Sequence, residues 1–356
     1  MPPHATSPIA LSQTTGPVFR ARSLEERGCE LWVKDDGSLS PLYGGNKVRK
    51  LEWLLAEAKA RGCRRLLTAG AAGSHHVLAT ALFGRMVGLP TAAVLCPQPD
   101  TSHARETLAR SLSVLQAAYP CSSMALVPWM LARHRQRGDA LIPVGGSNTL
   151  GAMGYDLAVD ELVGQIRGGE LPQPHLIVVA VGSGGTAAGL LAGLVRHRLT
   201  TNLCAVQVLG GRVLTHAAIA WLVAGLAASR RIRWKPLAAV RRLSISGSQV
   251  GRGYGHPTAA SELAMDAARS AGLALDPTYT AKAFAEVLAV MERAAKGLAY
   301  CSDRPWTPPV HGPLRILYWH TLSSVEPEVL PLEGSSLVGI ADRLLLGYPL
   351  PQAKTH

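Results

Sequence analysis

The pattern with the clearest chemical meaning is a pair of glycines followed by an amine, Gly44-Gly45-Asn46-Lys47, before a stretch of helical period. Two glycines allow the backbone to turn sharply or to approach a ligand closely. Asn46 can cap the following helix, which would place Lys47 in the first turn, at the positive end of the helix dipole. That position favours the neutral amine needed for a covalent bond to a carbonyl carbon. An ordinary capped helix with an exposed lysine would show the same pattern.

A second glycine-rich segment, residues 182–186, follows the apolar run Leu176–Val181 and precedes another helical pattern. A turn of this kind presents backbone N–H groups and a helix N-terminus to an anion, so we expect it to bind phosphate. A tight turn between a strand and a helix is the simpler alternative. The expected phosphate-binding residues are Gly182, Ser183, Gly184, Gly185 and Thr186.

The same segment fits the loose dinucleotide fingerprint through Gly182, Gly184 and Ala187. That fingerprint expects an acidic residue about twenty positions further on, at the end of the next strand. The next strand candidate, Leu203–Val208, leads into two glycines and has no carboxylate there. The Lys-Ser/Thr pair of a P-loop is also missing. A simple phosphate-bearing cofactor therefore fits better than a nucleotide, and a nucleotide-dependent oxidoreductase is disfavoured.

A third cluster, Ser74-His75-His76, lies between a predicted strand and a predicted helix, after Gly70 and Gly73. Its backbone N–H groups could hold a substrate carboxylate, and Ser74 could act on the substrate or cap the helix. Neighbouring residues on a helix point about 100° apart, so the two histidines are not expected to share a metal ion.

Two tyrosines stand at the starts of predicted helices. Tyr254 lies in the glycine-rich stretch 251–257, and Tyr279 lies in the stretch 276–282. Each alone is more often a packed loop tyrosine, but two such residues at the mouths of α/β units are candidates for an active site.

The elements that must position these residues alternate between short apolar runs and longer stretches of helical period. This alternation predicts an α/β fold with parallel sheets flanked by helices. The 356 residues suffice for two domains, and 47% hydrophobic against 17% charged residues allows a large core. Predicted helices include Val48–Arg61, Ala281–Ala295 and starts near His75, Leu150, Thr186 and Pro257. Predicted strands include Leu31–Val33, Leu66–Ala69, Thr91–Leu95, Leu176–Val181, Leu203–Val208 and Leu314–Tyr318.

Charge and composition exclude several classes of protein. The net charge is +12, but its basic residues are scattered, with one denser cluster at 230–235, so nucleic acid is not an expected partner. The six cysteines are too far apart for a zinc knuckle, and the first fifteen residues lack a signal-peptide pattern. The apolar stretch Ala217–Ala228 is too short to span a bilayer and predicts a buried helix. We therefore expect a soluble, cytoplasmic protein without a membrane partner.

Taken in order, these segments resemble the fold-type II pyridoxal-phosphate (PLP) enzymes, specifically the D-cysteine desulfhydrase and 1-aminocyclopropane-1-carboxylate (ACC) deaminase group. The resemblance covers residues 15–324 and includes two further stretches, 144–155 and His320-Thr321. It implies a Schiff base between PLP and Lys47, beside Asn46, with the phosphate on residues 182–186. It also implies that Ser74 is the active-site serine and that Tyr254 and Tyr279 are active-site tyrosines.

Four residues depart from the family pattern. His75 stands where the family has an Asn that is expected to contact the cofactor's ring oxygen, so His75 becomes the candidate contact. Leu322-Ser323 replace the usual Gly-Gly after His320-Thr321. Thr280 stands where ACC deaminases are expected to have a Glu facing the pyridine nitrogen. A hydroxyl can donate to a neutral nitrogen but carries no charge, which favours β-elimination over ring opening. Alternatively, Thr280 merely caps the helix at Ala281.

The resemblance implies a large PLP-binding domain of residues 1–51 plus 161–356 and a small α/β domain of residues 52–160. Residues 1–15 would form a loose arm, and 325–356 a C-terminal extension with a short helix near Leu337–Leu346. The implied activity is β-elimination and deamination of a small amino acid, as in a D-cysteine desulfhydrase, by a homodimer. Ser74, His75 and His76 would bind the substrate. The alternatives are an ACC deaminase and a PLP-binding protein with altered or lost catalysis.

Overall fold

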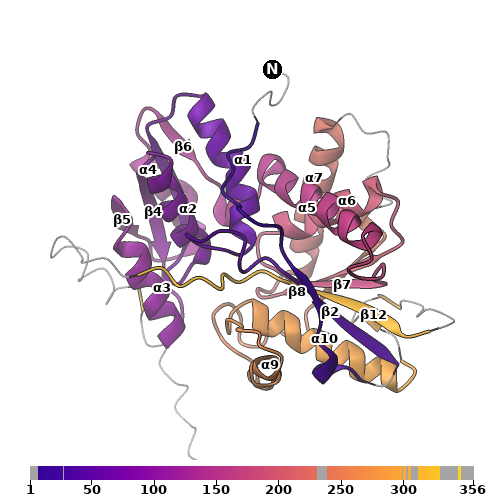
Figure 1. The fold of residues 1–356 in the computed structure, drawn as a ribbon. Helices are drawn as coiled ribbons and strands as arrows, with labels where there is room; N and C mark the ends of the chain where they lie inside the picture. Colours follow the sequence, from indigo (N-terminus) through magenta and orange to yellow (C-terminus); the bar gives the residue numbers. More distant parts are fainter. Residues whose placement is uncertain are drawn as a thin grey trace, which may run out of the picture. The chain divides into compact units, whose positions relative to one another are not determined.

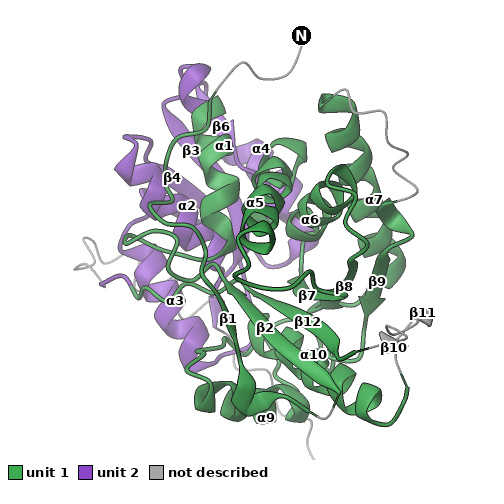
Figure 2. Ribbon diagram, turned by 45° about the vertical axis from the view of Figure 1, so that its right-hand side comes forward, with its two compact units in different colours: residues 1–57, 145–326 green, residues 58–144, 327–356 purple. Residues whose placement is uncertain are grey.

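The computed structural model describes residues 7–26, 28–230, 239–298, 300–301, 304–305, 312–328 and 344–345. It divides into two compact units (Figure 2): unit 1 holds residues 1–57 and 145–326, and unit 2 holds residues 58–144 and 327–356. Unit 1 thus begins its second segment earlier than the sequence predicts, at 145 instead of 161. The reason is helix α5 (Thr149–Arg167), whose apolar residues lie in the same core cluster as those of α6 (Gly185–Arg196).

Unit 1 is built on a six-stranded sheet in the order β1-β2-β12-β7-β8-β9. Its described pairings are parallel, except that β1 runs antiparallel to β2. Strand β12 lies between β2 and β7, so chain segments far apart in sequence lie side by side (Figure 1). The strands are β1 (Val18–Arg20), β2 (Cys29–Asp35), β7 (Leu176–Val181), β8 (Asn202–Gln207), β9 (Leu243–Ser246) and β12 (Leu314–His320).

Helices cover both faces of this sheet (Figure 1). One face packs against α5, α6 and α7 (Arg212–Ser229), and the other against α9 (Ala259–Ser270) and α10 (Thr280–Ala295). Because both faces are covered, the central strands are apolar runs rather than alternating patterns, as in the Leu-Ile-Val-Val-Ala-Val of β7. Short elements complete the unit: η1 (Arg22–Leu24), η3 (Val144–Gly146) and the antiparallel pair β10 (Tyr300–Cys301) and β11 (Arg304–Pro305).

Unit 2 contains a four-stranded parallel sheet in the order β5-β4-β3-β6. Its strands are β3 (Arg65–Ala71), β4 (Thr91–Cys96), β5 (Ala117–Pro120) and β6 (Asp139–Leu141), and its helices are α2 (His75–Met86), α3 (Ser102–Leu112) and α4 (Val127–His134), with η2 (Met124–Leu126). Helix α1 (Asn46–Ala60) begins in unit 1 and ends in unit 2.

The α/β fold class predicted from the sequence is confirmed, and each of the six predicted strands is present within one or two residues of its expected ends. The helix predicted at Ala281 begins one residue earlier, at Thr280. The predicted helix near 337–346 and most of the expected C-terminal extension lie outside the described residues, as do residues 231–235 of the basic cluster.

Helix α7 corrects the expectation of a wholly buried helix over Ala217–Ala228. It runs from Arg212 to Ser229, and by length and composition alone it is apolar enough to cross a membrane. One side contributes Ile219, Leu222 and Val223 to the core, whereas Val213 is 81% exposed and Trp221 68% exposed. The helix is therefore a half-buried cover of the sheet of unit 1.

Candidate active site

The backbone before Lys47 is tightly held within unit 1. A Cβ atom on Gly44 would lie 1.6 Å from the carbonyl oxygen of Gly37, and Gly45 has a φ of +79°, so both positions require glycine. The N–H of Gly45 donates to the Asp36 carbonyl (2.7 Å), and the N–H of Asn46 donates to the Thr321 carbonyl (3.1 Å). The glycine pair thus places the start of α1 against the ends of β2 and β12.

Asn46 does not flank α1, as a cap would, but is its first residue. Its side-chain Nδ2 donates to Thr186 Oγ1 (3.1 Å), and its Oδ1 accepts from Lys47 Nζ (2.7 Å). The side chain therefore joins the candidate cofactor lysine to residues 182–186, which we call the glycine loop.

Lys47 is the candidate nucleophile of unit 1. Burial of the amine lowers its pKa to about 8, although the residue keeps some exposed surface, and the carboxylate of Asp276 acts in the opposite direction. A lysine of this kind is partly neutral near physiological pH, which covalent bonding to an aldehyde requires.

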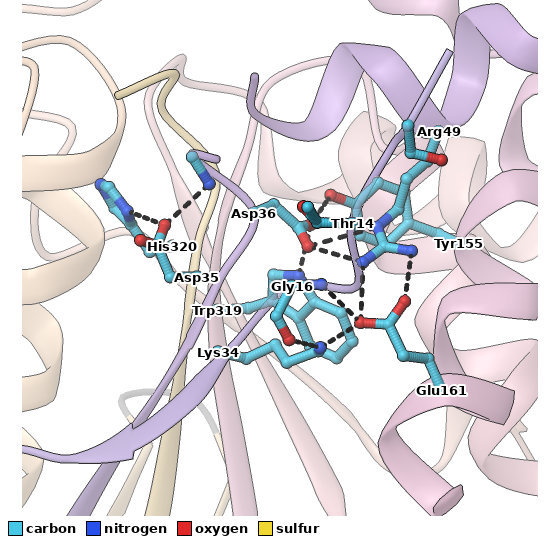
Figure 3. A network of polar contacts seen from close by, with 12 residues as sticks. Thr14, Gly16, Lys34, Asp35, Asp36, Arg49, Tyr155, Glu161, Trp319 and His320 are labelled. Carbon is cyan, nitrogen blue, oxygen red and sulfur yellow. Dashed lines mark hydrogen bonds and ion pairs between the residues drawn. The ribbon is translucent and has the colours of Figure 1, made fainter. Parts of the chain in front are cut away.

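A buried polar network surrounds Arg49, which follows Lys47 by two residues on α1 (Figure 3). The Arg49 guanidinium bonds Asp36 (2.8 Å) and Glu161 (3.0 Å), while the indole N–H of Trp319 donates to the other oxygen of Asp36 (2.7 Å). Tyr155 donates to that oxygen as well. Burial alone would raise the pKa of Asp36, but the charge of Arg49 holds it below its usual value.

The glycine loop connects β7 to α6. Gly184 has a φ of +87°, and Gly185 is the first residue of α6. The first N–H groups of α6, which have no acceptor within the helix, therefore lie at the glycine loop. The N–H of Gly185 donates to Ser147 Oγ (3.1 Å), and Ser147 Oγ bonds Ser183 Oγ (2.7 Å). A Cβ atom on Gly185 would lie 2.4 Å from Ser147 Oγ, so a side chain would fill the space at the helix start.

Lys50 completes this cradle, and sequence reasoning missed it. Its ammonium donates to the Gly145 carbonyl (3.0 Å) and Ser147 Oγ (3.3 Å), and only 2% of the residue is exposed. Burial and the neighbouring charge of Lys47 lower its pKa well below the usual value. No carboxylate among the described residues forms a salt bridge with it. A buried lysine next to a helix N-terminus fits a phosphate anion, whose negative charge would favour the protonated amine. The signal was its spacing: Lys50 follows Lys47 by one helical turn.

The structure brings the two predicted tyrosines together. Their hydroxyl oxygens lie 2.8 Å apart and their rings meet edge to face. Burial raises the pKa of Tyr254 to about 12 and that of Tyr279 further. A Cβ atom on Gly182 would be 3.3 Å from the Tyr279 ring, so the pair lies at the end of β7, next to the glycine loop.

Thr280 differs from its sequence-based interpretation. Its hydroxyl donates to the carboxylate of Asp276 (2.6 Å), and its oxygen accepts from the N–H of Asp276 (2.6 Å). The hydrogen that was expected to reach a cofactor nitrogen is therefore already used. Sequence reasoning did not identify Asp276 as part of the site.

The remaining candidates belong to unit 2. Ser74 caps α2, its Oγ accepting from the N–H of Val77 (3.4 Å). His75 Nε2 lies 2.9 Å from His103 Nε2 of α3. His76 is 3% exposed and bonds Thr68 Oγ1 (2.9 Å), whose hydrogen goes to the Ile142 carbonyl. His76 therefore lies in the interior of unit 2, whereas Ser74 is at the helix start.

An open parallel sheet with an amine of lowered pKa next to a phosphate cradle defines the class of enzymes that use an aldehyde cofactor bearing a phosphate. Comparison with known proteins agrees. The model of the pyridoxal-phosphate dependent enzyme family matches residues 9–301, and the chain belongs to that family. Its cofactor is PLP.

Individual relatives refine this assignment. The chain is 33% identical over 277 residues to a D-cysteine desulfhydrase of Yersinia pestis (strain Pestoides F), covering 75% of this chain and 82% of that one. It is 32% identical over 273 residues to a nocardicin C-9′ epimerase of Nocardia uniformis subsp. tsuyamanensis, covering 72% and 80%. Among solved structures, an ACC deaminase homologue has a TM-score of 0.71 at 24% identity, with 94% and 97% covered. That similarity shows the fold.

Proposed function

We propose that this enzyme eliminates the β-substituent of a small amino acid and releases a keto acid and ammonia, with D-cysteine as the first candidate substrate. D-cysteine and water would give pyruvate, sulfide and ammonia, which balances all atoms. The observation that carries the proposal is the placement of Lys47, with its pKa of about 8, beside the glycine loop and a pair of bonded tyrosines. The desulfhydrase relatives supply the substrate class.

PLP, when bound, supplies an electron sink for the bonds around the substrate's α-carbon. Lys47 would hold it covalently, and the glycine loop with Asn46 and Lys50 would hold its phosphate. Once released from the cofactor, the Lys47 amine can take or return a proton, as can Ser74. The tyrosine pair would relay a proton or stabilise charge.

The remaining candidates complete the proposed site. Thr280 would face the pyridine nitrogen, and His75 would contact the ring oxygen. Ser74, His75 and His76 would bind the substrate, for which the free N–H groups at the start of α2 offer a carboxylate site. The burial of His76 against Thr68 makes it the weakest of the three.

A panel of amino acids tests the proposal. PLP-loaded protein is incubated with D- and L-cysteine, β-chloro-D-alanine and ACC, and keto acid, sulfide and ammonia are measured, with a Lys47→Ala variant as the inactive control. We expect release of keto acid and sulfide from D-cysteine. Faster turnover of ACC would identify an ACC deaminase instead. A change of substrate chirality without keto acid would point to an epimerase, and folded, PLP-loaded protein without any turnover would point to a binding protein.

We also propose that the enzyme is a cytoplasmic homodimer. The homodimer is supported by the family resemblance, and light scattering of the purified protein tests it. The compartment is supported by Cys29, Cys63, Cys96 and Cys121, which are free thiols, as in proteins of reducing compartments.

A further inference from the structure

Asp276 is a buried carboxylate at the start of α10, and it is 2% exposed. One of its oxygens accepts from the backbone N–H groups of Thr278 (2.9 Å) and Tyr279 (2.7 Å). The other accepts from the N–H (3.0 Å) and the hydroxyl (2.6 Å) of Thr280. An ionised carboxylate is the form that accepts at all these positions, and the helix N-terminus favours its negative charge. Asp276 therefore fixes the backbone that carries Tyr279 and Thr280.

The negative charge of Asp276 also reaches the other candidate catalytic groups of unit 1. It raises the pKa of Lys47 against the effect of burial, and it contributes to the raised pKa values of Tyr254 and Tyr279. It acts in the same direction on Lys282, which lies on α10, and on Tyr318, whose hydroxyl donates to the Thr280 carbonyl. One buried carboxylate thus provides a shared counter-charge.

The bond to Asp276 determines what Thr280 can offer a ligand. A threonine hydroxyl has one hydrogen and two lone pairs. The hydrogen is donated to Asp276 Oδ2, and one lone pair accepts from the N–H of Asp276. The one position left is a lone pair, so Thr280 can only accept from a third group. A neutral pyridine nitrogen is itself an acceptor and would face this lone pair without a hydrogen between them, whereas a protonated nitrogen would donate to it.

We propose that Asp276 is a positioning residue that, acting through Thr280, keeps the pyridine nitrogen of bound PLP protonated. The inference rests on the proposed function, in which Thr280 faces that nitrogen. If Asp276 acts in this way, the site has a negative charge near the ring nitrogen, as ACC deaminases are expected to have through their Glu. The carboxylate lies one hydrogen bond further away, and Thr280 conveys its effect. The presence of Thr at position 280 therefore gives no reason to expect a weak electron sink.

The test measures the protonation of the ring nitrogen rather than activity. PLP labelled with ¹⁵N in the ring is bound to the full-length protein and fixed on Lys47 with borohydride, and the ¹⁵N chemical shift is recorded from pH 6 to 9. We expect the shift of a protonated nitrogen in the unmodified protein and in Thr280→Ser, which keeps the hydroxyl. Asp276→Asn and Thr280→Val should both give the shift of a neutral nitrogen in the upper part of that range.

A second measurement separates Asp276 from Thr280. In the cofactor-free protein, the pH dependence of Lys47 modification by a small amine-reactive reagent reports the pKa of Lys47. Asp276→Asn should lower that pKa, because the opposing charge is lost, whereas Thr280→Val should leave it unchanged. Lys282, Tyr254, Tyr279 and Tyr318, whose pKa values the charge of Asp276 also raises, are intact in both variants.

The outcomes distinguish this inference from the proposed function. A protonated nitrogen in both Asp276→Asn and Thr280→Val would overturn the inference, while keto-acid release by the unmodified protein would leave the proposed function standing. Conversely, the two variants could lose the proton of the ring nitrogen while the unmodified protein shows no turnover. That result would support the inference and refute the proposed function. If Asp276→Asn does not fold, as judged by circular dichroism, Thr280→Val and Thr280→Ser decide the question alone.

Discussion

The side-chain amide of Asn46 lies 3.1 Å from the hydroxyl of Thr186, which joins the start of α1 to the start of α6. The two residues are 140 positions apart in the chain, and each stands beside a different part of the proposed PLP site. Lys47 follows Asn46, and Gly185 precedes Thr186. This bond therefore links the residue next to the proposed attachment point of PLP with the proposed phosphate site.

Lys47 is expected to be the residue that bonds PLP. Borohydride reduction of the loaded protein, followed by digestion and mass spectrometry, should place the adduct on Lys47. Because its pKa is about 8, the fraction of neutral amine grows as the pH rises through that value, so capture of PLP by cofactor-free protein should accelerate between pH 7 and 9 and then level off. An adduct on Lys50 or Lys282 would contradict the assignment.

Gly184→Val should weaken PLP binding much more than it destabilises the fold. Gly184 has a φ of +87°, which a branched side chain adopts poorly, and the start of α6 would shift. Gly169→Val is the matched control, since that glycine also has a positive φ of +76° but has open space around its Cβ position. Fluorescence titration with PLP should show weaker binding for Gly184→Val alone. Equal PLP affinity of the two folded variants would argue against a phosphate site at the glycine loop.

Lys50→Met should affect PLP binding and protein stability in opposite directions. Removing a charged donor to the phosphate costs about 1.5–3 kcal/mol, or roughly 10- to 100-fold in affinity. The cofactor-free protein, in contrast, should become more stable at pH 7, because it no longer buries an amine whose charged form has no carboxylate partner. Urea denaturation and PLP titration measure the two effects.

The pH dependence gives the same prediction a second readout. The pKa of Lys50 is lowered in the folded state, so between the folded and the unfolded value the unfolded chain binds more protons. The stability of the cofactor-free protein should therefore rise with pH in this range, and Lys50→Met should reduce that slope. Lys59→Met, an exposed substitution on the same helix, is the control and should change neither stability nor affinity. Loss of stability in Lys50→Met at pH 7 would contradict the prediction.

The sequence predicts the chemistry of this site only where the residues involved are adjacent in the chain. The glycine pair before Lys47 and the glycine loop after β7 are local patterns, and both form the expected turns. Lys50 and Asp276 were missed because their roles depend on partners that folding supplies. Lys50 meets Ser147 across 97 positions of sequence, and Asp276 acts on Lys47 from a segment more than 200 positions further along the chain. The bond between Thr280 and Asp276 could not be predicted for a related reason, since the direction of a hydroxyl depends on its other bonds.

The network around Arg49 should make the protein sensitive to acid. Arg49→Met would leave the buried carboxylate of Asp36 without its salt-bridge partner, at a cost of about 3–5 kcal/mol, while Glu161 would keep its salt bridge with Lys34. The folded-state pKa of Asp36 is lowered, so its stabilising effect is complete above its unfolded value of about 3.9 and is lost as the pH falls through the folded value. Thermal unfolding between pH 2 and 5 should show a smaller dependence on pH in Asp36→Asn. An unchanged profile would show that the network contributes nothing.

The tyrosine pair should be needed for turnover, with the two hydroxyls acting unequally. Tyr254→Phe and Tyr279→Phe should each reduce kcat by about 10²–10⁴-fold, the range for a positioned proton-transfer group, while PLP binding persists. The hydrogen bond between the two hydroxyls lowers the pKa of Tyr254, which burial brings to about 12, and raises the pKa of Tyr279. In Tyr279→Phe the pKa of Tyr254 should therefore rise, and in Tyr254→Phe the pKa of Tyr279 should fall. Ultraviolet titration of phenolate formation in the cofactor-free variants measures both shifts.

Tyr318→Phe, which removes a buried hydroxyl bonded to the Thr280 carbonyl, is the control for loss of a tyrosine in this unit. If kcat fell equally in Tyr318→Phe, the effect would reflect disturbed packing rather than a specific role of the pair.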